Sequence, residues 1–229
     1  MIDFADIGEA VSLALQVLLV FLLLRGPIRR YFIIFLYSVV YLSTSVVEVI
    51  VSRQGGKLTP LYARVYWTDE IVLDLLLFLL VIVLALRATA QSPLRGAVAK
   101  LLLVVTVLAL VLPFVIGTSR FFSARWFRLT SQILNFGGAL MNLGLWTGLI
   151  GSKKREAELL VVSAGLGIAV AGQAIYYGIR LLTANPLLRS FSDVLNVLTH
   201  IAGVAIWCWA FRPKVGARSG SATAATHNA

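Results

Sequence analysis

Seven separate apolar runs constrain this chain more than any other feature. The runs span Ile7–Leu24, Tyr31–Val51, Trp67–Leu86, Ala97–Ile116, Phe127–Ile150, Glu158–Leu182 and Phe191–Phe211. Each is long enough, at about 20 residues, to cross a hydrocarbon core of about 30 Å. A backbone in lipid must satisfy its own hydrogen bonds, so each run is expected to be a helix. The sequence therefore predicts an all-α membrane protein built as a bundle of seven transmembrane helices.

The composition agrees with this prediction. Of the 229 residues, 59% are apolar and 13% are charged, which is more apolar surface than one soluble core can bury. Seven spans use most of the chain, so we expect a transmembrane domain over residues 1–212 and no separate soluble domain. The Gly, Ser, Ala and Thr residues of 213–229 predict a disordered cytoplasmic tail. The first run follows an acidic start and is expected to be an uncleaved helix. The single cysteine, Cys208, excludes an intrachain disulfide.

Basic residues in the connections predict the orientation. Twelve of the 20 lysines and arginines fall in segments 25–30, 87–100, 153–155 and 212–218, and eight fall in segments 53–64, 120–128 and 180–189. The positive-inside rule then places the N-terminus outside and the C-terminus in the cytoplasm. This predicts a multi-pass protein of the cytoplasmic (inner) membrane. A net charge of +10 spread over short loops suits the lipid bilayer as a partner and does not favour nucleic acid.

Polar side chains inside the apolar runs are the candidate functional residues, because such residues are costly in a membrane. They recur at spacings of three, four or seven, so each helix carries one polar stripe. The candidate ligand-binding residues are Glu48, Glu70, Asp74, Gln132, Asn135, Gln173, Tyr176, Arg180, Asp193, Asn196 and His200. At 1.5 Å per residue, Asp74 lies about 10 Å from the predicted start of its helix. The stripes predict a polar cup, open to the outside, above an apolar floor. The alternative interpretation is a set of ion pairs and hydrogen bonds that fix helix packing.

The sequence lacks the residues that several kinds of cofactor, metal and catalytic site require. No lysine lies in the middle of a run, and the chain has only two histidines, so a retinal attachment, a three-histidine zinc site and a bis-histidine haem are not predicted. No phosphate-binding loop or nucleophile elbow is present. We therefore predict no catalytic residues, no metal and no cofactor, and an enzyme is not favoured. His200 is interpreted as a hydrogen-bonded histidine, with a proton relay or a metal ligand as the alternative.

Two patterns bear on assembly. Small residues recur every fourth position at Gly144 and Gly148 and at Ser163, Gly167 and Ala171, which predicts close helix contacts within the chain, with a homodimer seam as the alternative. The openings of the third and seventh runs, Thr68–Asp74 and Ser192–Asn196, are faintly similar. With the mostly apolar fourth run as a lipid-facing linker, this similarity would suit a three-plus-one-plus-three repeat, an arrangement found in some small transporters.

Four features run over most of the chain. They are Tyr31-Phe32 at the start of the second run, Tyr66-Trp67-x-x-Glu70 at the start of the third, a basic start to the fifth around Arg128, and Ile206-Trp207 near the end of the seventh. By these features the chain resembles a group of bacterial seven-helix integral membrane proteins for which no activity is established. The resemblance implies a seven-helix unit and no particular activity.

The hypothesis that follows is a membrane protein that binds or senses a small polar or charged ligand from the outer side. The loops and tail are short, so signalling would need a cytoplasmic or membrane partner protein. A small transporter and a structural subunit of a membrane complex are the alternatives. The identity of the ligand, the oligomeric state and the protonation of the intramembrane acids stay open.

Overall fold

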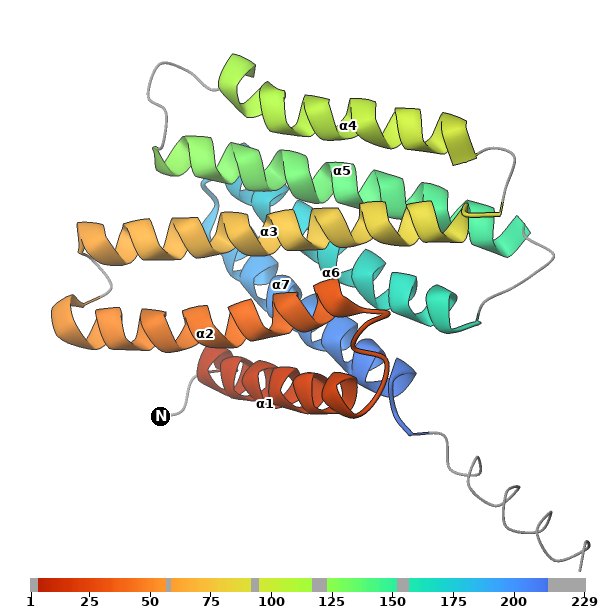
Figure 1. Cartoon of the computed structure of the whole chain (residues 1–229). Helices are drawn as coiled ribbons and strands as arrows, with labels where there is room; N and C mark the ends of the chain where they lie inside the picture. Colours follow the sequence, from red (N-terminus) through yellow and green to blue (C-terminus); the bar gives the residue numbers. More distant parts are fainter. Residues whose placement is uncertain (1–3, 57–58, 92–94, 117–122, 152–156, 214–229) are drawn as a thin grey trace, which may run out of the picture.

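The computed structural model describes residues 4–56, 59–91, 95–116, 123–151 and 157–213, and in these ranges it contains seven α-helices and no strand (Figure 1). The helices are α1 (Phe4–Arg25), α2 (Phe32–Gly55), α3 (Pro60–Ala88), α4 (Arg95–Ile116), α5 (Ala124–Gly151), α6 (Ala157–Leu182) and α7 (Pro186–Ala210). The predicted all-α fold of seven helices is confirmed. The predicted disordered tail lies, after Pro213, outside the described residues.

Six of these helices are long and apolar enough to cross a membrane, so the chain is a multi-pass membrane protein. Among the described helices, α5 does not meet that criterion. It is 28 residues long, packs against α3, α4 and α6, and runs between α4 and α3 in Figure 1. Two of its polar residues, Asn135 and Asn142, are buried against these neighbours. Lateral cover by three helices therefore explains how a less apolar helix belongs to this bundle.

Successive helices run antiparallel, and six of them close into a ring in the order α1, α2, α3, α5, α6 and α7, with α7 packed against α1. The remaining helix, α4, lies outside the ring and packs against α5 and α3. Long apolar side chains along α4 are exposed, among them Leu103, Val107 and Val115. This arrangement fits the predicted lipid-facing fourth helix. We call the end at which α1, α3, α5 and α7 begin the N-terminal end of the bundle, and the opposite end the C-terminal end.

Two helices, α3 and α7, begin more than one turn earlier than the apolar runs predicted. The predicted start of α3 at Trp67 is wrong by about two turns, because Thr59 caps the helix by accepting from the Tyr62 amide at 3.3 Å and Pro60 follows it. The Asn185 side chain likewise accepts from the Leu187 amide at 2.9 Å, and α7 begins at Pro186. Asp74 therefore lies near the middle of the 29-residue α3, about 21 Å from its start.

The largest cluster of buried apolar side chains fills the half of the ring nearer the C-terminal end. It includes Leu23 of α1, Ile34 of α2, Leu84 of α3 and Trp207 of α7, each at most 1% exposed. The indole of Trp207 donates to the Val162 carbonyl of α6 at 2.9 Å. Most of the buried polar side chains of the ring lie in the other half, although Ser38, Asn142 and Ser163 are buried in this one.

Of the glycines predicted to bring helices together, Gly167 does so: a Cβ added to it would clash with the Asn142 side chain of α5. A Cβ added to Gly144 or Gly148 would meet nothing within 4 Å, so the prediction that these two residues bring helices together within the chain is wrong. Both line a cavity between α5 and α4. A close approach that was not predicted joins α6 to α7, where a Cβ at Gly165 would lie 2.8 Å from the Gly203 carbonyl oxygen.

Candidate functional site

Two acidic side chains of α3, Glu70 and Asp74, lie one turn apart and therefore share one face of the helix. Asp74 is 1% exposed. The helices that bring polar groups to this face are α5 and α6, which pack against α3 on the inside of the ring. The candidate site consists of these two acids and the polar side chains around them.

An amide holds the Asp74 carboxyl group. The Asn135 side chain of α5 donates to Asp74 Oδ1 at 2.8 Å and to the Ser131 carbonyl oxygen at 3.0 Å. The Ser131 side chain, fully buried, lies against the same carboxyl group. Within the described residues, neither Asp74 Oδ2 nor Asn135 Oδ1 has a hydrogen-bond partner, although both atoms are buried. Asp74 therefore has one oxygen in use and one oxygen available to a ligand or a proton.

Tyrosines surround the Glu70 carboxyl group. The Tyr177 hydroxyl of α6 donates to Glu70 Oε2, and the Tyr66 hydroxyl, one turn earlier on α3, also hydrogen-bonds the carboxyl group. Tyr66 in turn contacts the hydroxyl of Tyr176. These contacts join α3 to α6 and give the Glu70 carboxyl group hydroxyl donors.

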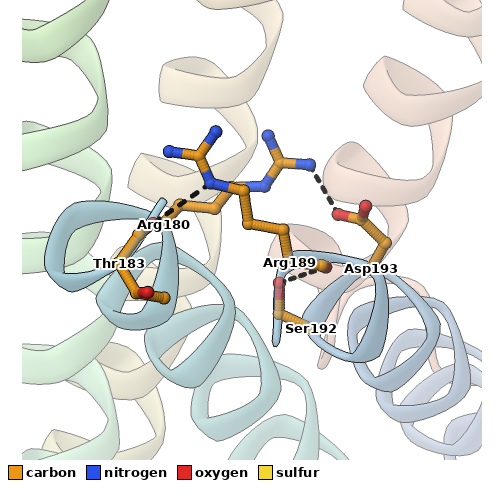
Figure 2. Close-up of polar contacts among 5 residues, drawn as sticks. All are labelled: Arg180, Thr183, Arg189, Ser192 and Asp193. Atoms are coloured by element: carbon orange, nitrogen blue, oxygen red, sulfur yellow. Dashed lines mark hydrogen bonds and ion pairs between the residues drawn. The ribbon is translucent and has the colours of Figure 1, made fainter. Parts of the chain in front are cut away.

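An arginine pair occupies the corner between the end of α6 and the start of α7 (Figure 2). Arg180 donates to Asp193 Oδ1 at 2.6 Å, and its guanidinium lies over the Tyr176 ring with Cζ 4.7 Å from the ring centre. Arg189 donates through Nε to the Thr183 carbonyl oxygen at 3.1 Å. Figure 2 shows the two arginine side chains crossing between the helices. This corner ties α6 to α7 at the N-terminal end.

A second polar cluster, made by α1, α2 and α7, lies around His200. The Gln16 amide nitrogen lies 3.5 Å from His200 Nε2, and the imidazole stacks on Tyr41 with ring centres 5.0 Å apart. The Tyr41 hydroxyl is hydrogen-bonded to Ser12 at 3.0 Å. Gln16 is fully buried, and its side-chain oxygen has no hydrogen-bond partner in the described part of the chain.

Tyr37 of α2 connects the two clusters. It is 1% exposed, its ring centre lies 6.3 Å from that of Tyr41, and it is close enough to Asp74 and Glu70 to interact with them electrostatically. Trp207 packs edge-on against Tyr37 at 5.9 Å. Tyr37 therefore lies where the polar half of the ring meets the apolar half.

The structure brings together about half of the residues predicted as ligand-binding. The cluster around α3 and the corner beside it contain Glu70, Asp74, Asn135, Tyr176, Arg180 and Asp193. His200 belongs to the second cluster, and Glu48 lies apart on α2, near Tyr62. The remaining three, Gln132, Gln173 and Asn196, are half-buried, each with a buried side-chain oxygen that has no hydrogen-bond partner among the described residues.

Several residues of the two clusters were not among the predicted ligand-binding residues. They are Ser12, Gln16, Tyr37, Tyr41, Tyr66, Ser131 and Tyr177. Helical spacing carried a signal for at least three of them, because Ser131, Tyr66 and Tyr177 each lie four residues from a predicted residue: Asn135, Glu70 and Gln173. A tyrosine or serine in an apolar run is weaker evidence for a functional site than an acid, because both residues also occur in ordinary cores.

The donor atoms define what the site can hold. Atoms near Asp74 that lack a partner are carboxylate and amide oxygens, which suit a hard cation or a proton rather than a soft transition metal. Across the described residues, no three His, Cys, Asp or Glu side chains gather as metal ligands. In the arginine corner, Arg180 is paired with Asp193, and Arg189 donates to the Thr183 carbonyl oxygen.

Comparisons with protein-family models, curated proteins and solved structures find no match to this chain. The resemblance to bacterial seven-helix proteins stays a prediction.

Proposed function

We propose that this membrane protein binds a small monovalent cation, a proton or sodium, at Asp74, and that occupancy of this site is what the protein senses. The observation that carries the proposal is the Asp74 carboxyl group: 1% exposed, held by one amide, with its second oxygen buried and without a partner in the described part of the chain.

Charge supports this choice of ligand. An ionised carboxylate in a low-dielectric interior costs several kcal/mol unless it is paired. The groups that contact Asp74 directly are Asn135 and Ser131, which are neutral, and Glu70 lies one turn away. Arg180, which faces the Glu70 side of the cluster, is paired with Asp193. A bound cation or a retained proton would remove the cost of an unpaired charge on Asp74.

The neighbouring side chains support a coordinating role. The Asn135 oxygen, together with the Asp74 oxygen that lacks a partner, supplies uncommitted acceptor atoms within one buried cluster. Hard monovalent and divalent cations take such oxygen ligands. The cluster lies near mid-length of α3, at the depth where transporters and channels commonly place ion sites.

We place the opening of the site on the N-terminal side of the bundle, outside the cell in the predicted orientation. The apolar cluster around Trp207 would separate the site from the cytoplasm, which favours sensing over free passage. Signalling would then require a partner protein at the basic C-terminal end.

A second candidate, a small cation-coupled transporter, is favoured by the order of helices in the ring. The groups α1–α3 and α5–α7 occupy the two halves of the ring with α4 outside it, as a three-plus-one-plus-three repeat would require. Ion flux into proteoliposomes would distinguish the transporter from the sensor, because a sensor whose site is closed towards the cytoplasm by the apolar cluster carries no ions across the membrane.

Thermal unfolding of the purified protein in detergent tests cation binding. The wild type is expected to unfold at a temperature that depends on pH, or on replacing sodium by choline at constant ionic strength. If the folded state retains a proton at Asp74, its stability falls as the pH rises. If it binds sodium, a hundredfold excess of sodium over Kd adds about 2.7 kcal/mol.

Asp74→Asn should remove this dependence and keep the fold, because the amide has nearly the same shape and carries no charge. Asp193→Asn is the matched control, since Asp193 is also acidic but lies in the half-exposed arginine corner; it should respond to pH and sodium as the wild type does. Equal responses in wild type and Asp74→Asn would contradict the proposal.

A further inference from the structure

A groove at the C-terminal end of the bundle combines three arginines with an apolar wall. It lies between the start of α2 and the end of α3 and has a volume of about 200 Å³. Arg29, Arg30 and Arg87 line it together with Tyr31. The groove is remote from the Asp74 site, since Arg87 lies in the last turn of α3 and Asp74 near its middle.

Two of the arginines, Arg30 and Arg87, contact the aromatic ring of Tyr31. Arg30 Cζ lies 5.6 Å and Arg87 Cζ 5.1 Å from the ring centre, and Arg87 also donates to the Arg30 carbonyl oxygen at 3.4 Å. Tyr31 is itself 2% exposed and packs on Phe211 at 4.8 Å. A fixed aromatic ring therefore holds two guanidinium groups at one place, in spite of their like charge.

The groove carries an excess of positive charge. Glu158 approaches Arg30 at 3.6 Å, and both side chains are partly exposed. Of the described residues that line the groove, three are arginines and none is acidic. The first turn of α2, which borders it, has no side-chain cap, so the positive end of the helix dipole adds to the attraction of an anion.

The wall beneath the arginines suits an acyl chain. Val83 lies about one turn and Leu80 about two turns further into the membrane than Arg87. Phe32, on α2, and Val83 are exposed on the lipid-facing surface. The charged and apolar parts of the groove follow each other in the order of a phospholipid headgroup and its chain.

We propose that this groove binds an anionic phospholipid, with the phosphate on Arg29, Arg30 and Arg87 and an acyl chain along Phe32 and Val83. Arginine pairs with phosphate through charged hydrogen bonds, and basic grooves at helix ends are known to suit anionic lipid headgroups. The proposal is independent of cation binding at Asp74.

Binding is tested with the full-length protein in detergent, by thermal stabilisation during titration with phosphatidylglycerol or with phosphatidylcholine of the same acyl chains. We expect phosphatidylglycerol to stabilise the wild type and phosphatidylcholine to do so much less. Arg29→Gln and Arg87→Gln should each weaken the apparent affinity for phosphatidylglycerol by about tenfold, the effect of one charged hydrogen bond.

Arg25→Gln is the matched control. Arg25 lies at the same end of the bundle, but its guanidinium packs over Phe21 of α1, outside the groove. The affinity of the Arg25→Gln protein for phosphatidylglycerol should therefore equal that of the wild type. Arg29 is exposed, so Arg29→Gln tests the groove even if Arg87→Gln unfolds the protein.

Three results would overturn the proposal: equal stabilisation by the two lipids, unchanged affinity in Arg29→Gln, or inorganic phosphate stabilising the protein as well as phosphatidylglycerol does. The last result would assign the arginines to a free anion rather than to a lipid.

Discussion

Asn135 of α5 donates its side-chain amide to Asp74 of α3 at 2.8 Å, and this hydrogen bond pairs the most buried acid of the bundle with a neutral partner. The same amide reaches the Ser131 carbonyl oxygen at 3.0 Å, so the side chain is held from two sides. These hydrogen bonds hold α3 against α5. At this contact an ionised Asp74 has a neutral amide and no basic side chain as its partner.

Asn135→Ala should lower the free energy of unfolding by about 1–3 kcal/mol, because it leaves Asp74 Oδ1 buried without its donor. Unfolding in detergent, followed by circular dichroism, measures the change. Replacing both partners, with Asp74→Leu and Asn135→Leu together, should cost less than the sum of the single changes, since no polar atom is then left unpaired. Additive losses would mean that the two side chains do not interact.

The Arg180–Asp193 pair should contribute little to stability, in spite of its 2.6 Å contact. The two side chains are 30% and 49% exposed, and pairs open to solvent typically contribute about 0.2–1 kcal/mol. A double-mutant cycle of Arg180→Gln and Asp193→Asn measures the coupling directly. A coupling energy well above that range would indicate that the corner is more shielded than its exposure suggests.

Gly165→Ala should destabilise the protein by about 1–3 kcal/mol, because the added Cβ would overpack the contact between α6 and α7. That Cβ would lie 2.8 Å from the Gly203 carbonyl oxygen and 2.8 Å from the Trp207 ring. Gly144→Ala is the control, since its Cβ meets nothing within 4 Å, and it should gain up to about 1 kcal/mol from helix propensity. Thermal unfolding of both variants measures these changes. A Gly165→Ala protein as stable as the wild type would contradict close packing of α6 against α7 at this position.

Trp207→Phe should cost about 1–3 kcal/mol, because it removes the indole that donates to the Val162 carbonyl oxygen and leaves that acceptor buried. Trp209 offers a matched control two residues further along α7: it is 53% exposed, whereas Trp207 is fully buried. Trp209→Phe should change the free energy of unfolding by less than about 0.5 kcal/mol. Similar losses from both substitutions would place the stabilising interactions elsewhere in α7.

The number of helices and the character of each helix followed from the sequence. Length, hydropathy and the demand of lipid for internal backbone hydrogen bonds act locally on each segment, so the seven runs and the lipid-facing fourth helix were predictable one at a time. The start of α3 was not, because the hydropathy pattern does not register the Thr59 cap and Pro60 that begin the helix before its apolar part.

The sequence by itself determined which face of each helix is polar, and it identified Glu70, Asp74, Asn135 and Arg180 as residues of those faces. Only the tertiary structure decided which polar faces meet: Asp74 with Asn135, Arg180 with Asp193, and His200 with Gln16 in a cluster of its own. The physical reason is that the rotation and axial register of each helix depend on close contacts between distant segments, such as Gly165 with Gly203. Such contacts arise from packing between helices, and the local pattern of one helix carries no record of them.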